Sequence, residues 1–242
     1  MRQSRIYTPQ TLRCADSIEL EGPASHYLSR VLRMSEGDTV IVFNGDGFDY
    51  PGEICGVQRQ RVQVSLGKGR PVENESSLKI TLVQAISRGE RMDYSLQKAT
   101  ELGVFCIQPV TSRRVEVRLD EKRRSKRLSH WQGVVISACE QSGRAVVPEV
   151  KTPISLDAWV ATADGSPRLV LDPDAVPRLS AFTVNKGAVS LLVGSEGGFS
   201  VEELQKMYAK GVFGVSLGPR ILRTESAGPA AIAILQAGIG DM

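Results

Sequence analysis

The sequence predicts two domains of different kinds: a small β-rich domain, and after it a larger α/β domain built on a parallel sheet. In the first part of the chain, short apolar runs alternate with turn-forming residues. In the second part, strand patterns alternate with amphipathic helix patterns. The length of 242 residues also exceeds that of an average single domain, which favours two unequal units.

The first domain is predicted to span residues 1–72 and to consist mainly of short strands. The runs TVIVFN, DYPGEICGV and RVQVSLG are typical of strands, and the NGDG run at 44–47 is typical of tight turns. The segment HYLSRVLRM (26–34) predicts a short amphipathic helix that turns Arg30 and Arg33 outward together.

A polar stretch without periodicity, residues 73–77, is the predicted linker, and the second domain is predicted to span 78–242. This domain begins as strand, helix, strand, an order that is typical of a parallel sheet. Ser200 and Glu203 predict a capping box at the start of a later helix that ends near Gly211. The predicted strands are 78–86, 104–110, 168–172, 189–194 and 213–218, and the predicted helices are 92–103, 125–142, 200–211 and 227–238.

Composition excludes several classes of protein. A hydrophobic fraction of 41% with 24% charged residues is ordinary for a folded globular chain. No stretch approaches the ~18 uninterrupted apolar residues of a membrane helix, and no apolar signal peptide opens the chain, so a cytoplasmic location is expected. The cysteines form no C-x-x-C pair, which predicts no metal site and reduced, mostly buried thiols at Cys14, Cys55, Cys106 and Cys139.

Two loops that follow predicted strands are the candidates for a ligand site: GSEGGFS (194–200) and LGPRILRTESAGPAA (217–231). Ligands bind at the carboxyl ends of parallel strands, and glycine lets the backbone approach a ligand closely. Ordinary strand-to-helix turns are the alternative interpretation. A phosphate cradle is disfavoured, because neither G-x-x-x-x-G-K-[ST] nor G-x-G-x-x-G after the first strand of the domain is present. The second loop adds Arg220 and Arg223 on either side of two apolar residues.

Four segments resemble, in order along the chain, the RsmE family of SPOUT methyltransferases, which methylate N3 of a uridine in 16S ribosomal RNA. They are RGERMDYSLQKATELGV (88–104), SACEQSGRAVVPEV (137–150), GSEGGFSVEE (194–203) and LGPRILRTESA (217–227). With an amino-terminal RxY start and the HYLSRVLR segment, the likeness spans nearly the whole chain. Ser195 and Ser226 stand where the family usually has proline and threonine, which bears on the rigidity of the loops.

For the fold, the resemblance implies an α/β SPOUT domain with a parallel sheet and a C-terminal trefoil knot, preceded by a small PUA-like β-barrel domain that binds RNA. Periodicity does not predict a knot, so the knot rests on the resemblance alone. The resemblance also implies a homodimer, with the site close to the partner subunit, and the small residues at 227–238 suit such close packing.

The resemblance implies S-adenosylmethionine as the cofactor, held by the two loops. Since this cofactor carries an activated methyl group, the enzyme must chiefly align donor and acceptor, and no metal is expected. Apolar residues, among them Leu171, would surround the adenine. The predicted cofactor-binding residues are Leu171, Gly194, Ser195, Glu196, Gly197, Gly198, Phe199, Leu217, Gly218, Ile221, Leu222, Thr224 and Ala227.

Methylation at uridine N3 requires that the base is unpaired and that N3 loses its proton. Arg223 is predicted to be catalytic because a permanently charged guanidinium would stabilise charge on the uracil oxygens. The alternative is that Arg223 pins the loop through Glu225 or a backbone carbonyl. Glu225 and Glu196 are the candidate proton acceptors, although a structural role ranks first for each. A general-base role for His26 or His130 is less favoured.

The net charge of +3 does not by itself indicate a nucleic acid partner, but residues 113–127 contain eight basic and three acidic residues, a local net charge of +5. A solvated face is the alternative interpretation of such a run. Together with two further basic clusters it favours contact with RNA phosphates. The predicted RNA-binding residues are Arg30, Arg33, Arg88, Arg91, Lys98, Arg113, Arg114, Arg123 and Arg124.

The sequence therefore predicts S-adenosylmethionine-dependent methylation of uridine N3 in 16S rRNA of the small ribosomal subunit. One alternative is a ribosome-assembly factor that binds 16S RNA without methylating it, which the two loops disfavour. The other is a SPOUT methyltransferase for another RNA, which the RMDYSLQKATELG and CEQSGR segments disfavour.

Overall fold

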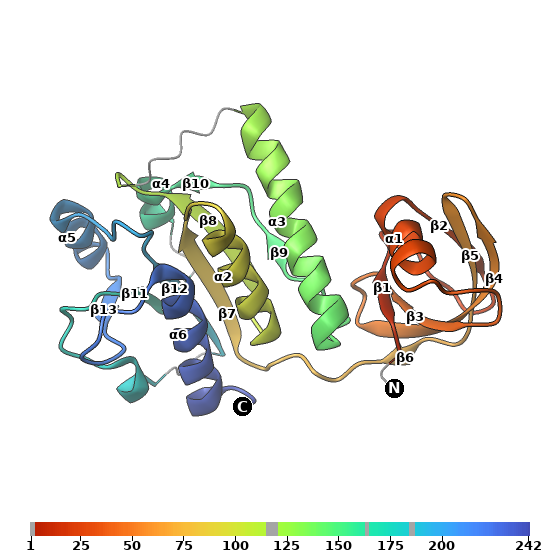
Figure 1. Cartoon of the computed structure of the whole chain (residues 1–242). Helices are drawn as coiled ribbons and strands as arrows, with labels where there is room; N and C mark the ends of the chain where they lie inside the picture. Colours follow the sequence, from red (N-terminus) through yellow and green to blue (C-terminus); the bar gives the residue numbers. More distant parts are fainter. Residues whose placement is uncertain (1–2, 115–120, 163–164, 184–186) are drawn as a thin grey trace. The chain divides into compact units, whose positions relative to one another are not determined.

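The computed structural model describes residues 3–114, 121–162, 165–183 and 187–242 (Figure 1). The chain forms two compact units. The first comprises Met1–Glu75 together with Cys139–Val147, and the second comprises Ser76–Ala138 and Pro148–Met242.

The first unit is built on a six-stranded sheet with the strand order β1-β3-β4-β5-β2, and β6 pairs with β4. Its strands are β1 (Arg5–Tyr7), β2 (Ser17–Glu21), β3 (Thr39–Phe43), β4 (Phe48–Gln58), β5 (Arg61–Leu66) and β6 (Arg70–Pro71). In β2 and β5 every second residue is buried, so apolar side chains from one face of each strand reach the core.

A short helical segment covers this core. It consists of α1 (Gly22–His26) and one turn of π-helix (Tyr27–Val31), and Leu28 from it is fully buried among the strand side chains. Arg30 and Arg33 are exposed, as the amphipathic pattern predicted. Arg33 has a φ of 54°, in the left-handed region, where the helical segment ends.

Residues 139–147 pack within the first unit through a buried polar network. The guanidinium of Arg144, whose side chain is only 5% exposed, pairs with Glu75. Glu140 accepts a hydrogen bond from the backbone N–H of Tyr7 at 3.0 Å, and Arg5 pairs with Asp49 while donating to the Arg144 carbonyl. The CEQSGR segment therefore serves the packing of the first unit.

The second unit is built on a parallel sheet with the strand order β10-β8-β7-β12-β11-β13, and β9 pairs with β8. All its pairings are parallel, which confirms the prediction from the strand and helix order. The strands are β7 (Lys79–Ala85), β8 (Cys106–Thr111), β9 (Glu149–Val150), β10 (Ile154–Ser155), β11 (Arg168–Leu171), β12 (Ala188–Val193) and β13 (Phe213–Val215).

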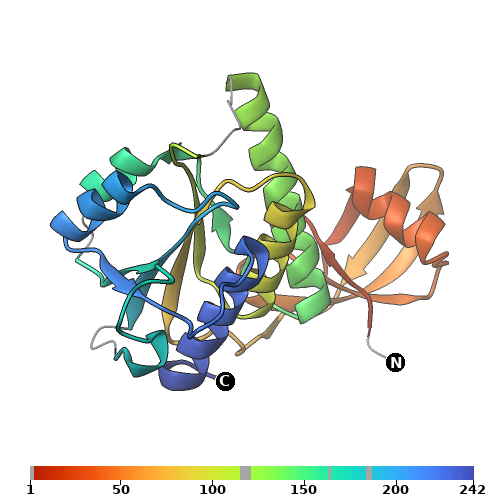
Figure 2. The ribbon, with the colours of Figure 1, turned by 60° about the vertical axis from the view of Figure 1, so that its left-hand side comes forward.

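Helices cover both faces of this sheet (Figures 1 and 2). The helices are α2 (Glu90–Glu101), α3 (Glu121–Ser142), α4 (Leu156–Ala161), α5 (Val201–Ala209) and α6 (Thr224–Ile239), with a 3₁₀ turn at Leu179–Ala181. Side chains of α4 and α5 join one core with Val83, Val110 and Val170 of the sheet. On the opposite face α6 lies against β7, where Gly228 approaches Leu82 and Gln84. Within the described residues, no helix is both long and apolar enough to cross a membrane.

Two predictions about local features need correction. The carboxyl-terminal helix begins at Thr224, three residues before the predicted start, so the end of the second loop is already helical. The cysteines are free, but only Cys106 and Cys139 are buried, whereas Cys14 and Cys55 are exposed. Both exposed cysteines lie in the small first unit, where little of the chain is distant from solvent.

Candidate active site

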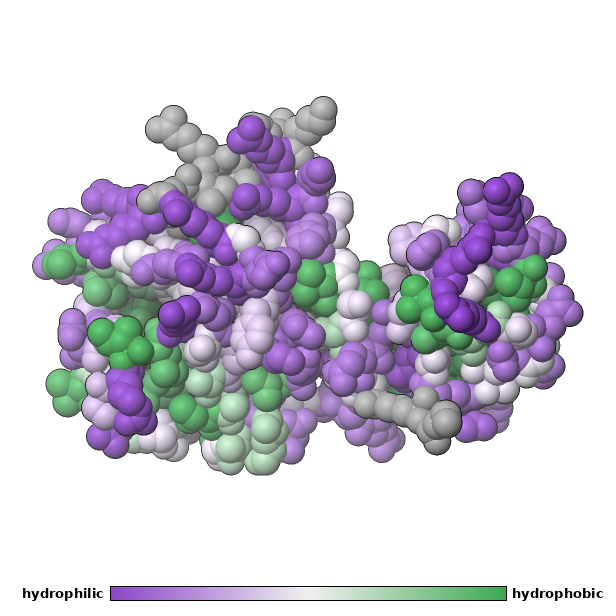
Figure 3. Space-filling model, in the orientation of Figure 1, coloured by the Kyte–Doolittle hydropathy of each residue, from purple (hydrophilic) through white to green (hydrophobic). Residues whose placement is uncertain are grey.

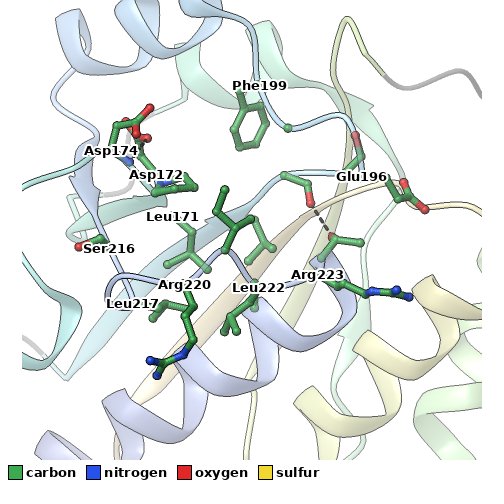
Figure 4. Close-up of a pocket in the computed structure, with 18 of the residues that line it drawn as sticks. Leu171, Asp172, Asp174, Glu196, Phe199, Ser216, Leu217, Arg220, Leu222 and Arg223 are labelled. Carbon is green, nitrogen blue, oxygen red and sulfur yellow. Dashed lines mark hydrogen bonds between the residues drawn. The ribbon is translucent and has the colours of Figure 1, made fainter.

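A pocket of about 510 Å³ lies at the carboxyl ends of β11, β12 and β13 (Figure 4). It is lined by the loop that follows each of these strands and by the first turn of α6. Twelve of the thirteen predicted cofactor-binding residues line it: Leu171, Gly194, Ser195, Glu196, Gly198, Phe199, Leu217, Gly218, Ile221, Leu222, Thr224 and Ala227.

Gly197 is the predicted residue that does not line the pocket. It lies on the outer side of its loop, where a Cβ would meet the Cβ of Arg114 at 3.2 Å. Its carbonyl oxygen accepts a hydrogen bond of 2.8 Å from Nη1 of Arg114. A side chain at position 197 would therefore press against an arginine outside the pocket.

Gly194, Gly198 and Gly218 are favoured by backbone angle or by close approach of the chain. Gly198 has a φ of 63° and Gly218 a φ of 120°, and residues with a Cβ rarely adopt such values. At Gly194 a Cβ would lie 3.3 Å from both Gly198 Cα and a ring carbon of Phe199. The loop thus folds back on itself at the end of β12, with Phe199 over the pocket (Figure 4).

The side chain of Thr224 joins the two loops through hydrogen bonds. Its hydroxyl donates to the carbonyl of Gly194 at 2.5 Å and accepts a hydrogen bond of 3.2 Å from Nε2 of Gln84. Ser87 lies 3.4 Å from the same hydroxyl. Because these bonds occupy the hydroxyl, Thr224 positions the loops, and its side chain has little capacity left for a ligand.

Arg223 stands at the start of α6 with an exposed side chain that extends toward α2 (Figure 4). Within the described part of the chain, its guanidinium forms no ion pair. Glu225 instead lies 4.0 Å from Nε of Arg91. The geometry therefore gives no support to Arg223 as a pin for the loop through Glu225, and it leaves the guanidinium available to a substrate.

Glu196 is held at the rim of the pocket by donors from α2 and the residues before it. One carboxylate oxygen accepts from the backbone N–H of Arg88 at 3.0 Å and from Nη1 of Arg91 at 2.9 Å. Burial raises the pKa of Glu196, but hydrogen bonds from its own backbone, Arg88 and Arg91 outweigh burial and bring the pKa below its ordinary value. A carboxylate with a lowered pKa is a weak base, which disfavours Glu196 as the proton acceptor.

The sequence reasoning missed an acidic end of the pocket, formed by Asp172 and Asp174 on the side opposite Glu196 (Figure 4). Asp172 is buried and accepts hydrogen bonds from the Tyr208 hydroxyl and from the Asp174 backbone N–H. A signal was present, because LDPD places carboxylates directly after an apolar strand, at the edge of the sheet where ligands bind.

The predicted RNA-binding residues divide between the units. Arg30 and Arg33 belong to the first unit, and the other seven to the second. Arg91 lines the pocket, Arg114 contacts the 194–200 loop, and Lys98 pairs with Glu101 within α2. Residues 115–120 of the basic run lie outside the described residues, while Arg113, Arg123 and Arg124 are exposed, as is Arg88.

The two histidines lie outside the pocket lining. His26 is exposed in the first unit, and His130 on α3 contacts Asp93 at 2.8 Å. The described residues contain no group of three or more histidine, cysteine or acidic side chains arranged to hold a metal ion.

Comparison with known proteins identifies the class. A family model described as an RNA methyltransferase domain matches residues 74–236, and one described as an RNA methyltransferase PUA domain matches residues 20–67. The chain thus combines an RNA methyltransferase domain with an amino-terminal RNA methyltransferase PUA domain.

Individual relatives narrow the class further. The ribosomal RNA small subunit methyltransferase E of Buchnera aphidicola subsp. Schizaphis graminum is 36% identical over 242 residues, which cover 100% of this chain and 98% of the relative. The crystal structure of the Neisseria gonorrhoeae protein of that name, bound to S-adenosyl methionine, is 38% identical, covers 99% of both chains and has a TM-score of 0.94. A Legionella pneumophila methyltransferase structure with bound cofactor SAM is 39% identical, covers 100% of both chains and has a TM-score of 0.97. This chain belongs to the ribosomal RNA small subunit methyltransferase E family.

Proposed function

We propose that this protein transfers a methyl group from S-adenosylmethionine to N3 of a uridine in 16S rRNA, with the small ribosomal subunit as substrate. One observation carries the proposal: the loops quoted for the family resemblance form a single pocket at the carboxyl ends of the parallel strands. Relatives with cofactor-bound structures match this chain over its whole length.

The residues of the pocket fit S-adenosylmethionine. A volume of about 510 Å³ is in the range of small-molecule sites, and Leu171, Leu217 and Leu222 give apolar walls for the adenine. Ser195 Oγ is buried and has no hydrogen-bond partner among the described residues, so a ligand group would satisfy it. Gly194 and Gly218 keep the backbone of both loops open to a ligand.

When bound, S-adenosylmethionine supplies an activated methyl group, so the protein must align the base with it and exclude water. Uridine N3 becomes nucleophilic when its proton leaves, and negative charge then spreads over the uracil oxygens. The guanidinium of Arg223 lines the pocket and forms no ion pair with a described residue, and it is the proposed stabiliser of that charge. Glu225, with 18% of its side chain exposed, remains the proposed proton acceptor.

The same proposal includes the finer features of the fold. The PUA domain would close into a β-barrel, since side chains from β1 to β5 meet in one core. The carboxyl-terminal segment would form a trefoil knot, as the family resemblance implies. A homodimer is supported by the exposed hydrophobic residues Phe213 on β13 and Ile221 and Leu222 in the loop before α6. They belong to the part of the chain around β13 and α6, where Figure 3 shows hydrophobic residues at the surface. A cytoplasmic location is supported by the ribosomal substrate.

Analysis of 16S rRNA by mass spectrometry tests the function. In a strain that lacks the gene, 3-methyluridine should be absent, and the wild-type protein should restore it. If the modified base persists without the gene, the function is misassigned. If the purified protein binds small ribosomal subunits that lack the modification and does not methylate their 16S RNA in the presence of S-adenosylmethionine, it is an assembly factor.

Arg223→Ala should lower turnover by on the order of a hundredfold, because one donor that stabilises transition-state charge is lost. Cofactor affinity should change little. Arg220→Ala is the matched control, since Arg220 lines the same pocket but its side chain extends away from Glu196 (Figure 4). Equal rates for the Arg223→Ala and wild-type proteins would exclude this role.

A further inference from the structure

The 194–200 loop is held from outside the pocket by residues that the sequence marked for RNA binding. Nη1 of Arg91 donates to the carboxylate of Glu196 at 2.9 Å. Nη1 of Arg114 donates to the carbonyl of the next residue, Gly197, at 2.8 Å. Two consecutive residues of the loop are thus fixed by arginines that come from different elements, α2 and the turn after β8.

Arg91 also approaches the second loop. Its Nε lies 4.0 Å from a carboxylate oxygen of Glu225, in the first turn of α6. Arg91 therefore lies between the carboxylates of both loops that line the pocket, and it is itself part of that lining. A displacement of this guanidinium would affect both walls of the cofactor pocket.

These arginines retain donors for another ligand. A guanidinium has five N–H donors in a planar fork. Within the part of the chain that the structure describes, Arg91 reaches Glu196 and Glu225. Arg114 donates to the Gly197 carbonyl. The pKa of Glu202 is lowered by a hydrogen bond from Ser200 and, further, by the charge of Arg114. The side chain of Arg91 is 45% exposed, and Arg114 is exposed as well. A phosphate could thus bind the outer edge of each guanidinium while the inner edge keeps its bond to the loop.

We propose that Arg91 and Arg114 are positioning residues that couple RNA binding to cofactor binding, each bridging an RNA phosphate and the 194–200 loop. The inference rests on the proposed function, because it takes RNA as the partner. A bound phosphate fixes the guanidinium in the position that holds the loop, so the loop loses less freedom when the cofactor binds. Coupling is reciprocal, and the cofactor must tighten RNA binding by the same factor.

Binding measurements on the full-length protein test the coupling. The probes are S-adenosylhomocysteine, which cannot transfer a methyl group, and a 16S RNA fragment that contains the target uridine. RNA should tighten the binding of S-adenosylhomocysteine to the wild-type protein by about fivefold or more. Arg91→Ala and Arg114→Ala should each reduce this factor to nearly one.

Two further variants separate coupling from loss of charge or of structure. Arg114→Lys keeps the charge but has no planar fork, so RNA affinity should largely remain while the coupling factor falls. Arg124→Ala removes an exposed arginine of α3 that contacts no described residue of the loop, so RNA should bind more weakly and the coupling factor should persist.

The inference is overturned if RNA leaves the affinity of the wild-type protein for S-adenosylhomocysteine unchanged or weakens it. It is also overturned if Arg91→Ala and Arg114→Ala lower affinity equally with and without RNA, because the arginines would then only support the loop. A methylation assay on small ribosomal subunits that lack the modification keeps the two proposals distinct. Methylation of the subunits without coupling refutes this inference alone, whereas no methylation of the subunits by the wild-type protein refutes the proposed function.

Discussion

At the acidic end of the pocket, the hydroxyl of Tyr208 on α5 donates a hydrogen bond to the buried carboxylate of Asp172. Burial, this hydrogen bond and the negative charges of Asp172 and Asp174 together raise the pKa of Tyr208 from 10.0 to about 12. Tyr208 therefore stays protonated across the physiological range and keeps the carboxylate of Asp172 oriented toward the pocket.

Spectrophotometric titration of tyrosinate should show one group that ionises near pH 12 in the wild-type protein and is missing from Tyr208→Phe. Asp172→Asn should move this ionisation toward pH 10.0, since it removes the adjacent negative charge. Because the pKa is raised in the folded state, the associated stability is complete below pH 10 and is lost as the pH rises through about 12. An unchanged titration in Tyr208→Phe would contradict the assignment.

At the scale of elements, the sequence predicted the features that depend on residues close together along the chain. Ser200 and Glu203 form the expected capping box, because both of its hydrogen bonds join residues three apart. The parallel sheet followed from the order of strands and helices. The hydrogen bonds of the Thr224 hydroxyl could not be predicted, since its partner Gln84 lies 140 residues away and no local pattern relates the two. For the same reason, the packing of Arg144 against Glu75 was not apparent.

Thr224→Val should lower the free energy of unfolding by about 1–3 kcal/mol, because the isosteric side chain leaves the Gly194 carbonyl and the Gln84 amide without their buried partner. Cofactor affinity should fall as well, since the two loops are no longer joined. Thr224→Ser keeps the hydroxyl and serves as the control in chemical denaturation. If Thr224→Val had the same free energy of unfolding as the wild-type protein, the hydrogen bonds of Thr224 would contribute nothing to stability.

At the scale of the whole molecule, basic residues occur on both units, at Arg30 and Arg33 in the first and along α2 and α3 in the second. Several separate basic clusters favour binding to a folded RNA surface over a flexible strand. Once one cluster has bound, a folded surface presents phosphates to the other clusters at a high effective concentration. This arrangement is consistent with an assembled small ribosomal subunit as the substrate.

The proposed homodimer is tested by sedimentation, which should give twice the 26.3 kDa of one chain at micromolar concentration. Gly238 is exposed on α6, and a Cβ there would have no neighbour within 4 Å, so Gly238→Arg should fold normally but prevent close packing of a second copy. Gly133→Arg on α3 is the matched control, because that position is equally open. The wild-type and Gly133→Arg proteins should sediment as dimers and Gly238→Arg as a monomer. A monomeric wild-type protein would exclude the dimer, and a dimeric Gly238→Arg protein would place the interface away from this end of α6.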